Sequence, residues 1–347
     1  MPDVETLHRD AVVVDTHNDL LMLVSRRPAA RQATYFRERW LPQLRAGGVD
    51  VQVLPVFIDD DFRPEGALRQ TLRMLEAGHR IAEEVGDEVQ LCGSGADIDE
   101  ALAAGRIALV LALEGCEAVG TDVEILGTLA RLGVRMASFT HFGRTALADG
   151  SAEDPAGSRL TRAGVEAVAR CEELGVLLDV SHLSAAGTDH VLELATRPVV
   201  ASHSSAHALQ AHHRNLTDER LKGIAATGGV VGVNFFYGFI DPVDPSVRRL
   251  VDHIEHVAEV AGIEHVGLGP DFVKEVFEQL TPPADGSVDF EGLDGRRTIP
   301  GLDGPAGLPL VTEEMVRRGW SEVDVRRALG ENWLRVFRAE MGQPATS

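Results

Sequence analysis

The feature that most constrains the fold is a regular alternation of short β-branched runs with segments of helical periodicity. Most of these runs are near-continuous strings of Val, Ile and Leu, which is typical of strands buried on both faces of a parallel sheet. Eight strands, each followed by a helix or a loop, predict the α/β class and, within it, a (β/α)8 TIM barrel. The eight runs are Val12–Asp19, Val49–Phe57, Ile107–Gly115, Val134–His141, Val176–His182, Pro198–Ser204, Gly229–Phe236 and His265–Phe272.

Helical patterns occupy most of the intervals between these runs. They are Glu65–Val85, Asp122–Leu132, Thr161–Leu174, Ala185–Ala195, Thr217–Thr227 and Pro245–Ala261. A doubly wound open sheet is the alternative for such an alternation, but its first turn is usually rich in glycine. Here the first run ends in the letters DTHND, which favours the barrel.

The 347 residues contain no linker rich in Pro, Gly or Ser, so we expect one catalytic barrel domain over residues 1–347. Two irregular segments, near 142–160 and 281–309, each follow a strand end and are expected as long loops over the barrel mouth. The second loop is our candidate for a lid that sets specificity. A C-terminal helix is expected near 321–339, with Ser321 as its N-cap.

Charge and cysteine usage narrow the class of protein. The chain has 33 Lys and Arg against 54 Asp and Glu, a formal charge of −21, so it would repel nucleic acids and anionic lipid surfaces. No signal peptide and no apolar run of the roughly 20 residues that span a membrane is apparent. The sparse set of three cysteines argues against a disulfide framework. We expect a cytoplasmic protein; a homodimer is compatible with the sequence.

Polar residues fall where the predicted strands end. In a TIM barrel, catalytic groups sit at these carboxyl ends, where a structural chain would continue with apolar residues. The residues concerned are His17, Asp19, Glu114, His141, His182, His203 and Asp271.

His17 and Asp19 are two residues apart, so on a strand they would share a face with about 6.6 Å between their Cα atoms, a spacing that suits two ligands of one metal ion. Together with Glu114, His182 and His203 they exceed what one tetrahedral zinc needs and fit two ions bridged by Glu114. Zn²⁺ is expected first, with Mn²⁺ or Co²⁺ as substitutes.

A different reading of Glu114 is a buried carboxylate paired with Arg135 or Arg144. For Asp271, the choice is between a group that orients and deprotonates water near the metals and a simple turn residue after Gly269-Pro270. A hydroxide held between two metal ions would be a nucleophile at neutral pH, because metal binding lowers the pKa of water.

Seven short motifs in order resemble the membrane (renal) dipeptidase family, peptidase family M19 of the amidohydrolase superfamily. They are VDTHNDL, ALEG, SFTH, LLDVSHLS, VVASHSSAHAL, RNLTDE and GLGPDF, and the resemblance runs from about Val12 to Phe337. The resemblance implies a metal-dependent barrel hydrolase with a binuclear zinc centre that cleaves dipeptides and tolerates a D-residue at the C-terminal position.

The resemblance also implies roles for single residues. It places one zinc ion on His17, Asp19 and Glu114, and the other on Glu114, His182 and His203. Asp271 would be the general acid and base, and His141 would contact the scissile carbonyl. Arg214, in substrate binding with its neighbour Asn215, would clamp the terminal carboxylate.

The chain departs from the family where GPDFVKEVF stands in place of the usual GxDFDG. Val273 and Lys274 therefore replace an Asp-Gly pair beside the catalytic Asp271, and the side-chain pocket there is expected to differ. Two alternatives stay open: another amidohydrolase reaction, on N-acyl amino acids or a related amide or lactone, and a metal-binding barrel without catalysis.

Overall fold

The computed structural model describes residues 3–280 and 292–343, and within them every named strand pair is parallel. Each of the eight predicted runs contains a strand. A ninth strand, β3, was not predicted; it is three residues long and pairs with the start of β4. The strands are β1 (Val13–Asp15), β2 (Val49–Phe57), β3 (Val89–Leu91), β4 (Ile107–Glu114), β5 (Val134–Ser138), β6 (Leu177–Asp179), β7 (Val199–Val200), β8 (Val231–Val233) and β9 (Val266–Leu268).

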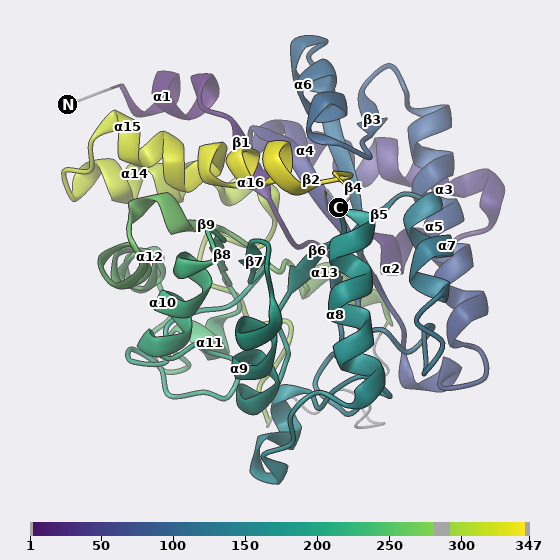
Figure 1. The fold of residues 1–347 in the computed structure, drawn as a ribbon. Helices are drawn as coiled ribbons and strands as arrows, with labels where there is room; N and C mark the ends of the chain where they lie inside the picture. The colour runs from purple at the N-terminus through teal and green to yellow at the C-terminus, as the bar shows by residue number, and fades with distance from the viewer. Residues whose placement is uncertain (1–2, 281–291, 344–347) are drawn as a thin grey trace.

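The strands follow one another around a barrel (Figure 1). The main sheet has the order β1-β2-β4-β5-β6-β7, and one parallel bridge, Ala201 to Val231, leads on to the pair β8-β9. The ring returns to β1 through isolated hydrogen bonds: the Asp271 amide donates to the His17 carbonyl at 2.9 Å, and the Thr16 hydroxyl donates to the Leu268 carbonyl at 2.8 Å. The predicted (β/α)8 barrel is confirmed.

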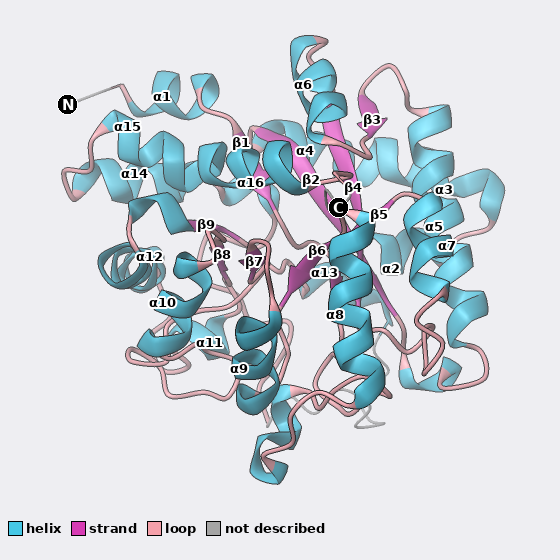
Figure 2. Ribbon diagram, viewed as in Figure 1, coloured by secondary structure: helices cyan, strands magenta, loops and turns pink. Residues whose placement is uncertain are grey.

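Helices form the outer layer around the strands (Figure 2). All six predicted helical segments are helical, and further helices precede β2, lie between β3 and β4, and precede the C-terminal segment. The longer helices are α5 (Ala67–Glu84), α6 (Gly95–Ala103), α8 (Arg162–Leu174), α9 (Ala185–Leu194), α10 (Asp218–Ala226), α12 (Val247–Ala261), α14 (Pro309–Arg317) and α16 (Asn332–Glu340). The shorter ones are α1 (Val4–Asp10), α2 (Leu20–Ser25), α3 (Ala29–Tyr35), α4 (Leu41–Ala46), α7 (Ile125–Arg131), α11 (Tyr237–Ile240), α13 (Lys274–Leu280) and α15 (Glu322–Arg326).

The barrel interior is a packed core closed at one end by α16. Inward side chains of the strands, such as Val14, Val53 and Val110, form one buried cluster with Trp333 and Phe337 of this helix. Gly267 in β9 makes room for the helix, because a Cβ there would lie 2.2 Å from Trp333 Nε1. The interior is therefore filled at this end, and the opposite end, where the strands terminate, is left for the functional residues.

The two segments predicted to be irregular loops can be compared with the structure to different extents. Residues 142–160 form a loop with one short 3-10 helix, Ser151–Ala156, as expected for an irregular segment. Of the expected loop at 281–309, residues 281–291 lie outside the described residues, and the rest contains the 3-10 turn Pro305–Gly307 before α14 begins at Pro309. The Ser321 side chain accepts a hydrogen bond from the Asp324 amide and caps α15, as predicted. No helix within the described residues is long and apolar enough to cross a membrane.

Candidate metal centre

The candidate residues converge because they follow the ends of adjacent parallel strands. Glu114 is the last residue of β4. Four others lie three residues beyond the end of a strand: His141 after β5, His182 after β6, His203 after β7 and Asp271 after β9. The strands are shorter than the sequence suggested, so these side chains stand on the connecting segments at the mouth.

The reasoning that placed His17 and Asp19 on one face of a strand is wrong. Strand β1 ends at Asp15, and Asp19 is the N-cap residue of α2 with φ −73° and ψ 21°. The two side chains nevertheless meet, with His17 Nε2 3.9 Å from Asp19 Oδ1. A turn in which Asp15 Oδ1 accepts a hydrogen bond from the His17 amide at 3.0 Å brings them together.

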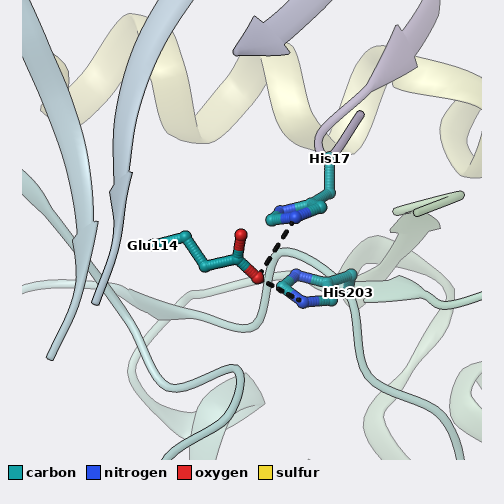
Figure 3. Close-up of side chains that lie close together, drawn as sticks. All are labelled: His17, Glu114 and His203. Carbon is teal, nitrogen blue, oxygen red and sulfur yellow. Dashed lines mark ion pairs between the residues drawn. The ribbon is translucent and has the colours of Figure 1, made fainter. Parts of the chain in front are cut away.

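Glu114 lies at the centre of the cluster. Its Oε1 atom is 2.9 Å from His182 Nε2, 3.4 Å from His17 Nε2 and 3.6 Å from His203 Nε2. Figure 3 shows the imidazoles of His17 and His203 facing this carboxylate from two different parts of the barrel. His141 Nε2 is slightly farther, at 4.0 Å.

The alternative ion pairs of Glu114 are not formed. Arg144 pairs with Asp149, and the Arg135 guanidinium donates to the backbone carbonyls of Gly93, Ala130 and Val134. Glu114 is 5% exposed and faces the histidines. A buried carboxylate surrounded by imidazole nitrogens is a metal-ligand arrangement.

Three overlapping groups of side chains bring their ligand atoms within 4.8 Å of one another. They share Glu114 or His17, so the candidate ligands form one continuous cluster. The groups are His17 with Glu114 and His203; Glu114 with His141 and His182; and His17 with Asp19 and Asp271. His182 Nε2 and His203 Nε2 are 2.7 Å apart.

Burial and mutual repulsion act on the carboxylates. Burial and the negative charge of Glu114 raise the pKa of Asp19 well above its ordinary value. Burial also raises the pKa of Asp271, and Glu114 adds to this effect. For Glu114 itself burial acts in the same direction, but the nearby imidazoles of His17 and His182 outweigh it and hold the pKa well below its ordinary value.

The imidazoles divide into two kinds. Burial opposes the charged form of His17, but Glu114, Asp19 and Asp271 outweigh it and raise the pKa of His17 to about 10. Burial lowers the pKa of His141 to about 3, with Arg63 and Arg214 contributing. Burial likewise lowers the pKa of His182 and His203 well below 6.5. Neutral imidazoles are the form that binds metal ions.

The residues fit divalent metal ions. His17 Nε2 and Asp19 Oδ1 are buried without a hydrogen-bond partner among the described residues, and buried polar atoms are rarely left in this state. Three carboxylates, Asp19, Glu114 and Asp271, share the site. Asp19 and Glu114 are buried and Asp271 is half-buried, and negative charge concentrated in this way is costly unless cations balance it. The mixed nitrogen and oxygen donors suit zinc and its neighbours in the first transition row.

Arg214 supplies a buried cation beside the cluster. It is 3% exposed, its Nη2 donates to the His203 carbonyl at 3.0 Å, and it makes no ion pair within residues 3–280 and 292–343. Its guanidinium carbon lies 5.5 Å from the ring centroid of Phe239 and 5.9 Å from that of Phe142. Burial lowers its pKa to about 10, which leaves it charged at neutral pH.

The Asn215 side chain donates to backbone carbonyls and not to residues of the cluster. Its amide nitrogen donates to the carbonyls of Gln210 and Phe239, at 2.9 Å and 2.8 Å. The donors of this side chain are therefore used to hold the loop that carries Arg214. A direct contact of Asn215 with substrate stays a prediction.

Asn234 is a residue at the site that the sequence analysis missed. It is fully buried just beyond β8, and its Nδ2 donates to Asp271 Oδ2 at 2.8 Å while its Oδ1 accepts from the Phe236 amide at 2.6 Å. The signal available in the sequence was a single polar residue directly after an apolar strand, in GVVGVNFF. This bond fixes which oxygen of Asp271 faces the mouth.

A second missed element is a chain of hydrogen bonds behind His203. Asp179 Oδ2 accepts from the Ser202 hydroxyl at 2.5 Å, and the Ser202 oxygen lies 2.7 Å from His203 Nδ1. Such partners fix the orientation of a metal-binding imidazole and leave the other ring nitrogen for the metal. In this chain, that nitrogen is His203 Nε2, which faces Glu114.

Fold and site together define an α/β barrel with a candidate metal centre of His and carboxylate side chains at its mouth. The family model for membrane dipeptidase, peptidase family M19, matches residues 1–282 and 286–346. The chain belongs to this family, as the motifs indicated.

Individual relatives agree with the family model. The chain is 31% identical over 272 residues to dipeptidase verJ of Clonostachys rogersoniana, a region that spans 78% of this chain and 65% of that protein. Among solved structures it is similar to dipeptidase AC, described as a metallopeptidase of family M19, with a TM-score of 0.84, 27% identity and coverage of 96% of this chain and 99% of that one. A metallopeptidase from Rhodobacter sphaeroides, liganded with a phosphinate mimic of the dipeptide L-Ala-D-Ala, gives a TM-score of 0.83, 26% identity and coverage of 96% and 100%.

Proposed function

We propose that the protein is a zinc dipeptidase that hydrolyses the peptide bond of dipeptides. The observation that carries the proposal is the buried Glu114 carboxylate, which lies within 4.0 Å of four imidazole nitrogens, beside a buried Arg214 that forms no ion pair with any described residue. Glu114 and the imidazoles fit metal ions, and Arg214 fits a substrate carboxylate.

Two zinc ions would be held by one continuous set of side chains. His17, Asp19 and Glu114 would bind one ion, and Glu114, His182 and His203 the other, with Glu114 shared. When bound, such ions act as Lewis acids on a carbonyl and lower the pKa of water. Mn²⁺ and Co²⁺ are expected substitutes because they accept the same donor set.

The remaining residues would orient the substrate and move a proton. Arg214 would bind the C-terminal carboxylate, since a planar guanidinium offers two parallel donors to it. His141, with a neutral ring and 15% side-chain exposure, would donate to the scissile carbonyl oxygen. The Asp271 carboxylate is oriented by its hydrogen bond from Asn234. It would carry a proton from water to the departing amine.

Dipeptides with a D-residue at the C-terminal position are included in the proposal. The support is the Rhodobacter sphaeroides relative, whose bound ligand mimics L-Ala-D-Ala. Arg214 would bind the terminal carboxylate of either stereoisomer, so the configuration at the last α-carbon would be decided by the side-chain pocket.

The test is metal analysis together with a substrate panel. We expect about two equivalents of zinc in the protein and turnover of L-Xaa–L-Xaa and L-Xaa–D-Xaa dipeptides. N-acyl amino acids serve as the comparison: faster turnover of these would favour the alternative amidohydrolase reaction. Bound zinc without hydrolysis of either class would favour a metal-binding barrel without catalysis.

The other expectations from the sequence stay predictions. These are the single barrel domain over residues 1–347, the cytoplasmic location, the homodimer, and the specificity lid within 281–309. Beside Asp271, Lys274 forms an ion pair with Asp303 at 2.9 Å, and Val273 packs against the core. The departure from the family pattern therefore ties α13 to the segment before α14.

A further inference from the structure

The loop over residues 142–160 crosses the chain segment that carries His182. Gly150 and Leu183 form an antiparallel bridge, and the Ser184 amide donates to the Asp149 carbonyl at 2.9 Å. Arg144 in turn binds both carboxylate oxygens of Asp149. The loop is therefore fastened to the backbone directly after a candidate metal ligand.

Two donors converge on the carbonyl oxygen of His182. The Ser151 amide donates to it at 2.7 Å and the Thr140 hydroxyl at 3.3 Å. His182 has φ 69°, a left-handed conformation that residues other than glycine rarely adopt. Such a conformation persists only where the surroundings hold it, and these two hydrogen bonds do so directly.

Gly150 brings the loop against the backbone of a second site residue. Its φ of −78° suits any residue, so only space forbids a side chain there. A Cβ would lie 2.2 Å from the His141 carbonyl oxygen and 2.3 Å from that of Phe142. These neighbours are backbone atoms, so a side chain at position 150 must displace either the loop or the segment that carries His141.

We propose that the Gly150–Ser151 turn is a positioning element for the imidazoles of His182 and His141, and that Gly150 and Thr140 are positioning residues of the metal centre. The inference rests on the proposed function, since it takes His182 as a zinc ligand. The turn acts through the backbone. The Ser151 amide donates a hydrogen bond to the His182 carbonyl, and Gly150 packs against the His141 carbonyl.

The test is zinc affinity, measured by competition with a chromophoric chelator on the metal-free protein. Gly150→Ala should weaken one of two zinc equivalents by about tenfold or more, in the range found when a group that orients a metal ligand is lost, and leave the other equivalent unchanged. The matched control is Gly143→Ala in the same loop, because a Cβ at Gly143 meets nothing within 4 Å. This control should bind both equivalents as the unmodified protein does.

Thr140→Val is a second variant that needs no rearrangement of the loop. It keeps the shape of the fully buried side chain and removes only the hydroxyl that donates to His182. It should weaken the same zinc equivalent severalfold. In both variants kcat should fall more than KM rises, because Arg214 is untouched. If Gly150→Ala does not fold, as judged by near-UV circular dichroism, the zinc affinity of Thr140→Val alone decides whether the positioning role holds.

His182→Ala separates this inference from the proposed function. An unmodified protein that binds no zinc would overturn the proposed function. If the unmodified protein binds two equivalents and His182→Ala loses one, the ligand assignment stands. In that case, Gly150→Ala and Thr140→Val variants with the affinity of Gly143→Ala would overturn the positioning role alone.

Discussion

Two residues at the mouth share a backbone conformation that their side chains disfavour. His182 and Asp271, with φ of 69° and 58°, are the non-glycine residues with positive φ in the described part of the chain. Each such residue costs of the order of 1–3 kcal/mol, which the surroundings must offset. The Asp271 backbone amide donates a hydrogen bond to the His17 carbonyl, and its side chain accepts one from Asn234; both hold the residue in place. Backbone strain and functional side chains thus coincide at the same positions.

The bond between Asn234 and Asp271 gives the first prediction at this scale. Asn234→Asp keeps the oxygen that accepts from the Phe236 amide but replaces the donor to Asp271 with a second carboxylate. We expect kcat for a dipeptide to fall by about tenfold or more, because general acid–base catalysis needs a correctly oriented proton carrier. Zinc content should stay unchanged. Steady-state kinetics and metal analysis check both statements, and a kcat equal to that of the unmodified protein would contradict the orienting role.

Arg214 gives the second prediction. Arg214→Lys keeps a positive charge but loses the planar pair of donors, so kcat/KM for a dipeptide should fall about tenfold to a hundredfold, equivalent to roughly 1.5–3 kcal/mol for bonds to a charged group. The same kinetics are measured on the matching dipeptide amide, which lacks the terminal carboxylate. On that substrate the variant and the unmodified protein should differ little. Equal losses on both substrates would mean that Arg214 acts only through its bond to His203.

At the scale of elements, the strand pattern made much of the site predictable. Parallel strands of a barrel end at one mouth, so the polar residues near six of the eight predicted strand ends had to meet there, and Glu114, His182 and His203 do. The position of each side chain relative to its strand was less predictable. The assignment of His17 and Asp19 to a strand failed because β1 stops at Asp15, whose own carboxylate forms the turn.

Elements that depend on distant contacts could not be predicted from local patterns. The short β3 (Val89–Leu91) exists because it pairs with β4, and it has too few residues for a recognisable pattern. The need for glycine at position 150 arises from the carbonyls of His141 and Phe142, which only the folded loop brings near. Asn234 reaches Asp271 because β8 and β9 are adjacent. In each case the information lies in tertiary packing rather than in the period of the sequence.

The contact between α12 and α14 gives a prediction about stability. Arg318 pairs with Glu314 at 2.8 Å and with Glu255 at 2.5 Å, and hydrogen bonds from Arg317 and Arg318 lower the pKa of Glu314 from 4.5 to about 2. Glu314→Gln should reduce the free energy of unfolding at pH 7 by roughly 1.5–3 kcal/mol, as for hydrogen bonds to charged groups. Because the folded pKa is depressed, this contribution is present above about pH 4.5 and is lost as the pH falls toward 2.

Urea unfolding of both proteins at pH 7 and at pH values below 4.5 checks this prediction. The difference between them should shrink in the acid range. Glu313→Gln is the matched control, since Glu313 is the preceding residue of α14 and makes no ion pair with any described residue. A pH-independent difference between Glu314→Gln and the unmodified protein would show that packing, rather than the charge of Glu314, accounts for the loss.

The whole molecule carries a charge of −21, and part of this negative charge is buried at the mouth of the barrel. Asp19 and Glu114 are buried and Asp271 is half-buried, and the charge of Glu114 raises the pKa of both Asp19 and Asp271. Arg214 and His17 offset part of this repulsion at Asp271. Divalent cations should therefore stabilise the fold as a whole, and not only complete the site.

Zinc should accordingly raise the midpoint of thermal unfolding of the metal-free protein. A free ligand at a hundred times its Kd stabilises the native state by about 2.7 kcal/mol, which corresponds to a rise in Tm of roughly 5–10 °C for a domain of about 200 residues, and to a smaller rise for a larger one. Differential scanning calorimetry with chelator and with zinc measures the shift. Glu114→Gln, which removes the shared ligand, should lose most of it, and Mg²⁺ should give a smaller shift because it prefers oxygen donors to imidazole. A Tm that is the same with chelator and with zinc would contradict the link between the metal centre and global stability.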